Sequence, residues 1–307
     1  MLRGVNLCGA EFGETALPGI PGTNYTWNSE ASFRYFGAKG LGLIRIPVLW
    51  ERLQPEAYGP LESEYLAGLR ANLDWAAASV CRVIIDVQNF GRYYGRVAGP
   101  ETLADLWVRL VLAFGDHPAL YGWGLMNEPH DTGATRWMEA SQAVVTAIRA
   151  TGDTTLILVP GEAWSSARRW PDVHGAQAWI RDPADNFAYE AHQYFDRDGS
   201  GRYRRTYEDE LARDPALALR GPERLSPFVA WCRANGVRGY LGEYGVPDTD
   251  IRWYGVLDLF LSALDDAGFD GTYWAAGEWW GAYPLSVQPA GGFDRPQMAV
   301  LEAHLGL

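Results

Sequence analysis

The 307-residue sequence lacks several features that would place it in a common class at once. No apolar run reaches the length of a membrane-spanning helix, and no pattern repeats at the period of a solenoid. Residues 1–5 lack a basic segment followed by an apolar stretch, so they are predicted to begin a first strand and not a signal peptide. No stretch has the composition of an interdomain linker. One domain spanning residues 1–307 is therefore expected.

Basic residues are scarce relative to acidic ones. The chain has 26 Lys and Arg residues against 38 Asp and Glu residues, which gives a formal net charge of −12. Nucleic acids and anionic membranes bind proteins through a basic footprint. Neither is expected as a partner here, whereas an uncharged polysaccharide is compatible with this charge.

Cysteine is also scarce. Cys8, Cys81 and Cys232 are an odd number, are far apart and match no zinc-binding spacing. They are expected to be small packed residues, with one disulfide left open. No metal site and no cofactor is predicted.

Several catalytic motifs are missing. There is no Gly-x-Ser-x-Gly elbow, no His-Glu-x-x-His and no glycine-rich phosphate loop after a first strand, which argues against an esterase of that type, a zinc protease and a dinucleotide-binding enzyme. Asp196–Gly201 resembles the start of a calcium loop. Its twelfth position is Tyr207 and not Glu, so a turn is expected instead.

Short β-branched or aromatic runs alternate with longer stretches of helical periodicity. Such alternation predicts a parallel sheet, and eight units favour closure into a single (β/α)8 TIM barrel over a doubly wound open sheet. The eight runs are Arg3–Leu7, Leu43–Val48, Arg82–Val87, Leu120–Met126, Thr155–Val159, Phe187–His192, Gly239–Gly242 and Gly271–Trp274. The helical stretches include Glu64–Ser79, Thr102–Phe114, Arg136–Ala150 and Tyr254–Ala267, and the polar stretch Arg197–Arg224 is expected to be a long loop with a short helix.

Polar or aromatic residues end six of these runs, and the carboxyl ends of barrel strands are where such folds place their active sites. Glu128 and Glu243 end the fourth and seventh runs. Cleavage of a glycosidic bond needs one carboxylic acid to protonate the leaving oxygen and a second carboxylate at the anomeric carbon. We therefore predict that these two glutamates face each other across the barrel mouth, with Tyr194 and Arg45 near the ionised one.

Each residue also has a simpler interpretation. A single Glu at a strand end is usually an ion-pair or capping residue, His192 could be a hydrogen-bonded core histidine, and Trp274 could fill the barrel. Their joint occurrence at the strand ends favours a site. The other acidic residues near strand ends are Glu11, Glu162, Glu190 and Glu278.

Aromatic residues are abundant, with 14 Trp and 16 Tyr. Flat rings with polar edges can stack on sugar rings, although most could equally be core. Among those that follow or end strands, we predict Trp27, Trp164 and Trp274 as sugar platforms.

These motifs resemble those of glycoside hydrolase family 5, the cellulase family. Asn127-Glu128-Pro129 resembles the family's Asn-Glu-Pro, and Gly242–Gly245 resembles the segment that holds its nucleophile. The resemblance implies that Glu128 is the general acid/base and Glu243 the nucleophile. It also implies that further residues surround the subsite of the cleaved sugar, namely Arg45, Asn127, His192, Tyr194 and Trp274. The segments Gly4–Leu7, Ala10–Gly13, Leu49–Pro55 and Leu125–Asp131 resemble those of the family's endo-β-1,4-glucanases.

The third strand end departs from the family pattern. The family usually has Asp-x-His-Asn there, whereas this sequence has Asp86-Val87-Gln88-Asn89. Glutamine donates and accepts hydrogen bonds but does not titrate. We expect Gln88 and Asn89 to contact substrate, and any tuning of the glutamates by a histidine to be lost.

The resemblance implies a retaining endo-β-1,4-glucanase that needs no cofactor and cleaves cellulose, soluble cellulose derivatives or mixed-linkage β-glucan. It further implies a secreted location, although no signal peptide is found and a cytoplasmic protein remains the alternative. A monomer is also expected. A mannanase, xyloglucanase, mixed-linkage glucanase or transglycosylase on the same scaffold remains an alternative. A non-catalytic β-glucan-binding barrel is the rival from another class.

Overall fold

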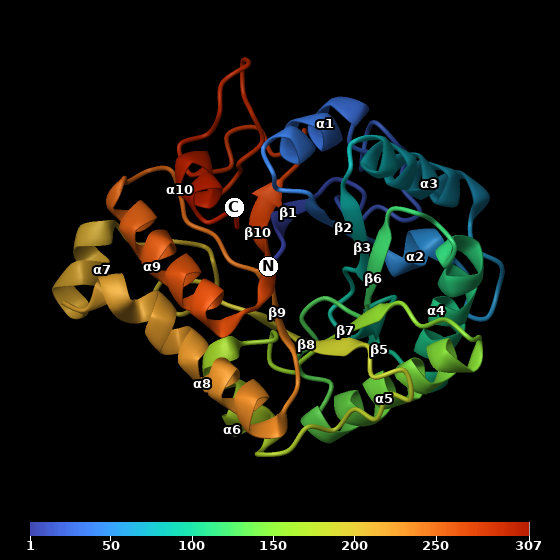
Figure 1. Cartoon of the computed structure of the whole chain (residues 1–307). Coiled ribbons are helices and arrows are strands. Elements are labelled where there is room, and N and C mark those ends of the chain that lie inside the picture. The colour runs from blue at the N-terminus through green and yellow to red at the C-terminus, as the bar shows by residue number, and fades with distance from the viewer. Residues whose placement is uncertain (307) are drawn as a thin grey trace.

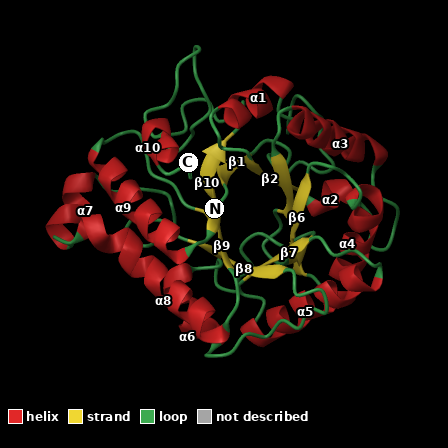
Figure 2. Ribbon diagram, viewed as in Figure 1, coloured by secondary structure: helices red, strands yellow, loops and turns green. Residues whose placement is uncertain are grey.

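Aliphatic and aromatic side chains dominate the eight predicted runs, and these runs form a closed barrel of parallel strands. The computed structural model describes residues 1–306. The strands follow the order β1-β10-β9-β8-β7-β6-β3-β2 around the barrel, and every pairing in it is parallel. Helices surround this ring (Figures 1 and 2). The predicted (β/α)8 barrel is thus confirmed.

The observed strand bounds differ from the predicted runs by two residues at most. Four runs match from end to end. The barrel strands are β1 (Arg3–Leu7), β2 (Leu43–Val48), β3 (Arg82–Val87), β6 (Leu120–Gly124), β7 (Leu156–Pro160), β8 (Phe187–His192), β9 (Gly239–Glu243) and β10 (Asp270–Ala276). The short strands β4 (Arg92–Tyr93) and β5 (Arg96–Val97) pair outside the barrel as an antiparallel hairpin.

The helices carry apolar stripes that cover the outside of the barrel. The four helical stretches predicted from periodicity correspond to α3, α4, α5 and α9. The α-helices are α1 (Glu30–Ala38), α2 (Trp50–Leu53), α3 (Ser63–Ala78), α4 (Pro100–Phe114), α5 (Ala134–Ala150), α6 (Trp170–His174), α7 (Tyr207–Arg213), α8 (Arg220–Asn235), α9 (Arg252–Ala267) and α10 (Met298–Ala303). Two 3-10 turns, η1 (Ala167–Arg169) and η2 (Leu217–Leu219), complete the set.

One predicted segment needs correction. Arg197–Arg224 was expected to be a long loop with one short helix, but it contains α7, η2 and the first residues of α8. Thr206 caps α7 by accepting a hydrogen bond from the Asp209 N–H, so the helix begins where a capping residue allows it. The loop proper is therefore shorter than the polar composition suggested.

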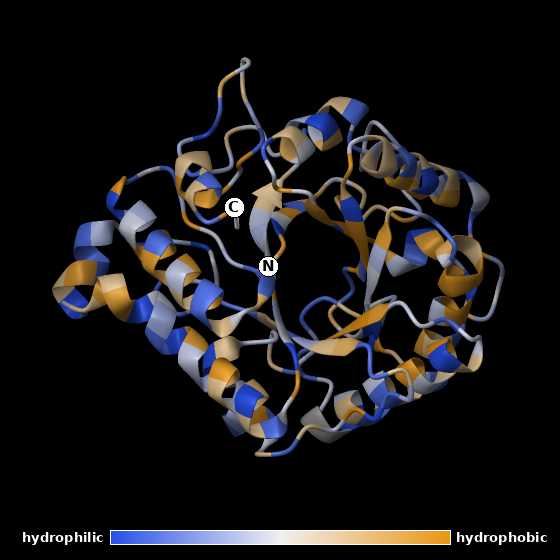
Figure 3. Ribbon diagram, in the orientation of Figure 1, coloured by the Kyte–Doolittle hydropathy of each residue, from blue (hydrophilic) through white to orange (hydrophobic). Residues whose placement is uncertain are grey.

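Side chains inside the barrel are apolar toward the amino ends of the strands and charged toward the carboxyl ends. Leu43, Ile84 and Leu158 belong to a small buried cluster of strand residues. Side chains two positions apart on a strand share a face, so Arg45 follows Leu43 and Asp86 follows Ile84 toward the carboxyl ends of β2 and β3. Alternate strand residues join the helices in the large hydrophobic cluster outside the barrel. Several strands accordingly have hydrophobic colouring in Figure 3. The charged layer thus rests on an apolar floor.

The three cysteines are all buried and none is paired, which answers the question of a disulfide left open by the sequence. Among residues 1–306, no helix is both long and apolar enough to cross a membrane.

Candidate active site

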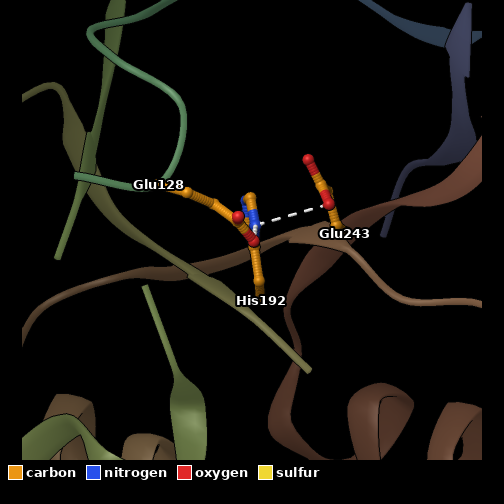
Figure 4. Close-up of side chains that lie close together, drawn as sticks. All are labelled: Glu128, His192 and Glu243. Carbon is orange, nitrogen blue, oxygen red and sulfur yellow. Dashed lines mark hydrogen bonds and ion pairs between the residues drawn. The ribbon is translucent and has the colours of Figure 1, made fainter. Parts of the chain in front are cut away.

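Two glutamates meet at the carboxyl end of the barrel. Glu128 lies four residues beyond the end of β6, in a left-handed backbone conformation (φ 43°), and Glu243 is the last residue of β9. A carboxylate oxygen from each and a ring nitrogen of His192 all lie within 4.8 Å of one another (Figure 4). Retaining glycosidases hold their carboxyl groups about 5–5.5 Å apart, whereas inverting enzymes leave about 6.5–9.5 Å. The spacing therefore fits a nucleophile and a proton donor acting on one bond.

Glu243 is held by three donors. Tyr194 Oη donates a hydrogen bond of 2.7 Å to Glu243 Oε2, and Arg45 Nη1 lies 3.4 Å from Oε1. His192 Nδ1 lies 3.6 Å from Oε2. Burial raises the pKa of Glu243 above its ordinary value, and its partners His192 and Arg45 oppose that rise. The contacts fix the carboxylate in one orientation and favour its ionised form.

His192 contacts both glutamates. Its Nδ1 lies 2.8 Å from Glu128 Oε1, and its Nε2 lies 3.2 Å from Glu190 Oε1. Burial alone would lower the pKa of this imidazole, but Glu243, Glu128 and Glu190 outweigh it and raise the pKa to about 10. His192 is therefore a protonated donor to carboxylates on both sides near neutral pH.

Arg45 is the buried centre of the charged layer. Its guanidinium Nη2 lies 2.8 Å from Asp86 Oδ1 and 3.0 Å from Glu190 Oε1, with no side-chain exposure on any of the three residues. Burial raises the pKa of Asp86 well above its ordinary value. Burial also acts on Glu190, but Arg45 and His192 outweigh it and hold its pKa below the ordinary value.

Cations and carboxyl groups are interspersed in the layer. Arg45 and His192 are cations that favour the ionised form of Glu190, whereas burial opposes the ionisation of Asp86 and Glu243. A buried cluster of this kind is stable only if its charges compensate one another. Glu128 lies at the rim of this layer, where 18% of its side chain is exposed.

The three groups at the centre could in principle bind a metal ion, because Glu128, His192 and Glu243 each offer one ligand atom. A metal-binding histidine must be neutral. Since the surrounding carboxylates keep His192 protonated, its ring has no lone pair to offer. The donor set therefore suits proton transfer and not metal binding.

Two cavities meet at Glu128. The first, of about 430 Å³, is lined by Gln88, Asn127, Glu243 and Trp274 among others. Asn127 Oδ1 accepts a hydrogen bond of 3.0 Å from Arg45, which orients its amide nitrogen away from that guanidinium. Gln88 Oε1 is buried and has no partner among the described residues. We name this cavity the nucleophile pocket.

The second cavity, of about 730 Å³, opens on the other side of Glu128 and is lined by Trp164, His130 and His192 but not by Glu243. The His130 and Trp164 rings stack with centroids 4.5 Å apart and an interplanar angle of 11°. Trp164 is 46% exposed. The backbone N–H of Trp164 donates to Pro129 O, which ties this residue to the loop that carries Glu128.

The structure places two predicted substrate-binding residues elsewhere. Asn89 accepts a hydrogen bond from Trp50 N–H and donates one to Glu51 Oε2, so both ends of its amide hold the protein together. Trp27 packs on Tyr65 with ring centroids 4.8 Å apart, close above Gly68 of α3. Neither residue lines the two cavities described above.

Sequence reasoning gave Asp86 and Glu190 no assigned role and did not single out His130. The alternation along β8 could have indicated Glu190, because it lies two residues before His192 and so on the same inward face. His130 follows Glu128 at a loop position where no periodicity applies, so no signal was available for its stacking.

The remaining acidic candidates have structural partners. Glu162 accepts hydrogen bonds from the Thr132 N–H and hydroxyl, and Glu278 accepts them from Ser29 at the start of α1. Glu11 accepts one from the Gly9 N–H. None of the three lines either cavity.

Comparisons with known proteins agree with this geometry. Residues 5–278 match the model of the cellulase family, glycosyl hydrolase family 5. The chain is 34% identical to endo-beta-1,4-glucanase B of Emericella nidulans, over 98% of this chain and 90% of that protein. It is 41% identical to the Pseudomonas stutzeri endoglucanase Cel5A solved in complex with cellobiose, with a TM-score of 0.93 over 99% of this chain and 92% of that one. An endo-beta-1,4-glucanase from Xanthomonas axonopodis pv. citri is 38% identical, with a TM-score of 0.91 over 99% and 98% of the two chains.

Proposed function

The chain belongs to glycosyl hydrolase family 5, the cellulase family, and from this membership we infer that Glu243 and Glu128 perform a two-step cleavage of β-1,4-glucan. The enzyme is a retaining endo-β-1,4-glucanase. The observation that carries the residue roles is the placement of both carboxylates and His192 within 4.8 Å of one another.

In the first step Glu243 attacks the anomeric carbon while Glu128 protonates the leaving oxygen. Tyr194 and Arg45 hold the attacking carboxylate in place through its two oxygens. A free Asn127 amide hydrogen can donate to the sugar 2-hydroxyl, an interaction that strengthens in the transition state. The result is a glycosyl ester on Glu243 and a released acceptor chain.

In the second step Glu128 removes a proton from water, which attacks the ester and restores Glu243 with retention of configuration. His192 stays protonated throughout and donates to Glu128, so the acid/base alternates between its two states beside a constant positive charge.

The substrate is an oligosaccharide or polysaccharide, as the bound cellobiose of the Pseudomonas stutzeri relative suggests. We propose that residues 1–307 act as one catalytic domain and as a monomer. The net charge of −12 supports the further proposal that neither nucleic acid nor an anionic membrane is a partner.

The test is release of reducing sugar from a panel of β-glucan, mannan and xylan. Wild type is expected to act on β-glucan with a rapid fall in viscosity, as internal cleavage requires. Glu243→Ala and Glu128→Ala should each lose roughly 10³-fold in kcat. Glu64→Ala, an exposed substitution on α3, is the matched control and should leave turnover unchanged.

Azide separates the two roles. In Glu243→Ala the small anion can replace the missing carboxylate and should give a glycosyl azide of inverted configuration. In Glu128→Ala azide should instead trap the ester and give the retained configuration. If the wild-type protein cleaves no polymer, the result supports the non-catalytic β-glucan-binding barrel. If it cleaves mannan in preference to β-glucan, the result favours the mannanase alternative.

A further inference from the structure

The cavity that contains Trp164 lies on the leaving-group side of the scissile bond. Glu128, which protonates the leaving oxygen, lines both cavities, whereas Glu243, Asn127 and Trp274 line only the nucleophile pocket. The sugar attacked by Glu243 therefore occupies the nucleophile pocket, and the released chain occupies the other cavity. We name the latter the leaving-group pocket.

A flat surface for a sugar is present in the leaving-group pocket. The stacked rings of His130 and Trp164 form part of its wall, and Trp164 is exposed enough to receive a sugar face. Ala163 and Trp164 of this wall, and the buried Ser165 that follows them, have left-handed backbone conformations with φ of 60°, 59° and 50°. Such strained conformations concentrate at ligand-binding sites.

Positive charge gathers around this platform. Four arginines line the leaving-group pocket against two carboxylates, Glu128 and Asp198. The nucleophile pocket has one arginine among its lining residues. The four are Arg168, Arg169, Arg202 and Arg224. In a chain with a net charge of −12, this is a local reversal of sign.

The four arginines lack carboxylate partners. Within residues 1–306, none of them forms an ion pair, whereas Arg45, Arg149 and Arg220 each lie within 4.0 Å of a carboxylate. Arg224 is 7% exposed and donates instead to the main-chain carbonyls of Tyr194, Asp196 and Arg197. An Arg held only by neutral groups keeps its full charge in the pocket wall.

The surroundings of Arg224 disfavour its positive charge, although Asp196 acts in the opposite direction. Burial lowers the pKa of Arg224 to about 10, and the nearby positive charges of Arg168 and Arg220 act in the same direction. Neighbouring guanidinium groups repel one another, and an anion placed between them would relieve that repulsion. A neutral glucan offers no such anion.

We propose that the leaving-group pocket binds a sugar that carries a carboxylate, with its ring on the His130–Trp164 platform and its carboxylate at Arg168 and Arg169. Guanidinium groups pair with carboxylates through two parallel hydrogen bonds, which fixes both position and orientation. The inference rests on the proposed function, because it places the acidic sugar in the fragment released by Glu128. The preferred substrate is then an acidic β-1,4-glucan.

The test compares three sets of cello-oligosaccharides of equal length. One set is neutral, one carries uronate units made by oxidation of the 6-hydroxyl, and one carries carboxymethyl ethers, so that the two sources of a carboxylate are distinguished. Wild type is expected to have a KM about ten-fold lower for at least one acidic set than for the neutral set. Raising the ionic strength should reduce that advantage.

The variant R168Q/R169Q should abolish the advantage of the acidic sets over the neutral set. Both arginines are exposed and their side chains form no hydrogen bond within the described residues, so the fold should be unaffected. The matched control is R34Q/R213Q, which removes the same charge from the outer helices α1 and α7. The acidic unit should also be recovered in the fragment that contains the original reducing end.

Equal KM values for acidic and neutral sets, or an equal loss on both in R168Q/R169Q, would overturn the inference. Recovery of the acidic unit in the other fragment would also overturn it. In each case cleavage of the neutral set still upholds the proposed function. Failure of wild type to cleave any of the three sets would instead refute the proposed function itself.

Discussion

At the scale of single residues, the site depends on an imidazole that is kept protonated. His192 lies among Glu128, Glu190 and Glu243, which raise its pKa to about 10 despite burial. A neutral histidine has a single ring N–H and could donate a hydrogen bond to only one carboxylate. As a cation, His192 can donate to carboxylates from both ring nitrogens. These contacts fix the separation of the carboxylates.

Gln88 marks the residue-scale departure from the family pattern. It lines the nucleophile pocket and its Oε1 has no partner among the described residues. We predict that Gln88→His moves the acid limb of the kcat/KM profile to lower pH, by up to about one unit. A protonated histidine there would favour the ionised form of Glu243, whose ionisation that limb reports. The measurement is kcat/KM on a soluble β-glucan from pH 4 to pH 9.

The control is Gln88→Asn, which keeps an amide and adds no titratable group. Its acid limb should coincide with that of wild type even if its activity falls. A profile of Gln88→His that overlays both would show that position 88 does not tune the glutamates.

At the scale of elements, the neighbouring strands β8 and β9 pack closely together at the charged layer. Glu190 and His192 point inward from β8, and Gly242 faces them from β9. A Cβ added at Gly242 would lie 2.0 Å from Glu190 Oε1 and 2.6 Å from His192 Nε2. The glycine before the nucleophile therefore provides space, and not only flexibility.

We predict that Gly242→Ala displaces the Glu190–His192 pair and lowers kcat by at least ten-fold, because the displaced His192 no longer holds Glu128 and Glu243 at their spacing. Overpacking of this kind should also cost about 1–3 kcal/mol in the free energy of unfolding. Initial rates and urea unfolding curves measure the two effects.

The matched control is Gly255→Ala. Gly255 lies on the exposed face of α9, where an added Cβ meets nothing within 4 Å. Alanine should stabilise this helix by about 0.5–1 kcal/mol and leave kcat unchanged. Full activity in Gly242→Ala would mean that the strands can separate without disturbing the pair.

At the scale of the whole molecule, closure of the barrel brings the two ends of the chain together. β1 pairs with β10, and the Arg3 guanidinium donates to Phe269 O at 2.6 Å and pairs with Asp265 at 2.5 Å. Figure 1 shows the blue first strand beside the red last one. The strands that carry the site can face one central point only when this ring is closed.

The closed molecule holds protons that the unfolded chain releases. Burial raises the pKa of Glu11 from 4.5 to about 7, and the carboxylates around His192 raise its pKa from 6.5 to about 10. In both pH windows the native state binds more protons than the unfolded state, so stability falls as pH rises. For Glu11 the loss between pH 4.5 and about 7 is on the order of 3 kcal/mol.

We therefore predict that Glu11→Gln, which is permanently uncharged, has a flatter dependence of stability on pH between 4.5 and 7. The variant should be more stable than wild type at pH 8 and close to it at pH 4.5, as measured by urea unfolding at several pH values. Glu64→Gln on the surface of α3 is the control and should follow the wild-type curve. If the curves of unfolding free energy against pH are parallel for Glu11→Gln and wild type, Glu11 ionises in the native protein without a large cost in stability.

The sequence by itself determined the barrel, because hydrophobic periodicity and turn residues are local properties. The observed ends of runs such as Leu43–Val48 and Phe187–His192 match the predicted ones. The candidate glutamates could also be identified from the sequence, because Asn127-Glu128-Pro129 and Gly242–Gly245 are contiguous segments. A strand end identifies a candidate but not its neighbours.

The tertiary structure alone decided what those candidates touch. The charges of Asp86, Glu190 and His192 depend on distances between residues from different strands, and these distances exist only after closure. The same holds for Asn89, which looks like a substrate ligand in the sequence but bonds Trp50 and Glu51 in the fold. Local sequence fixes which face a side chain takes, whereas electrostatic and hydrogen-bond partners come from segments far apart along the chain.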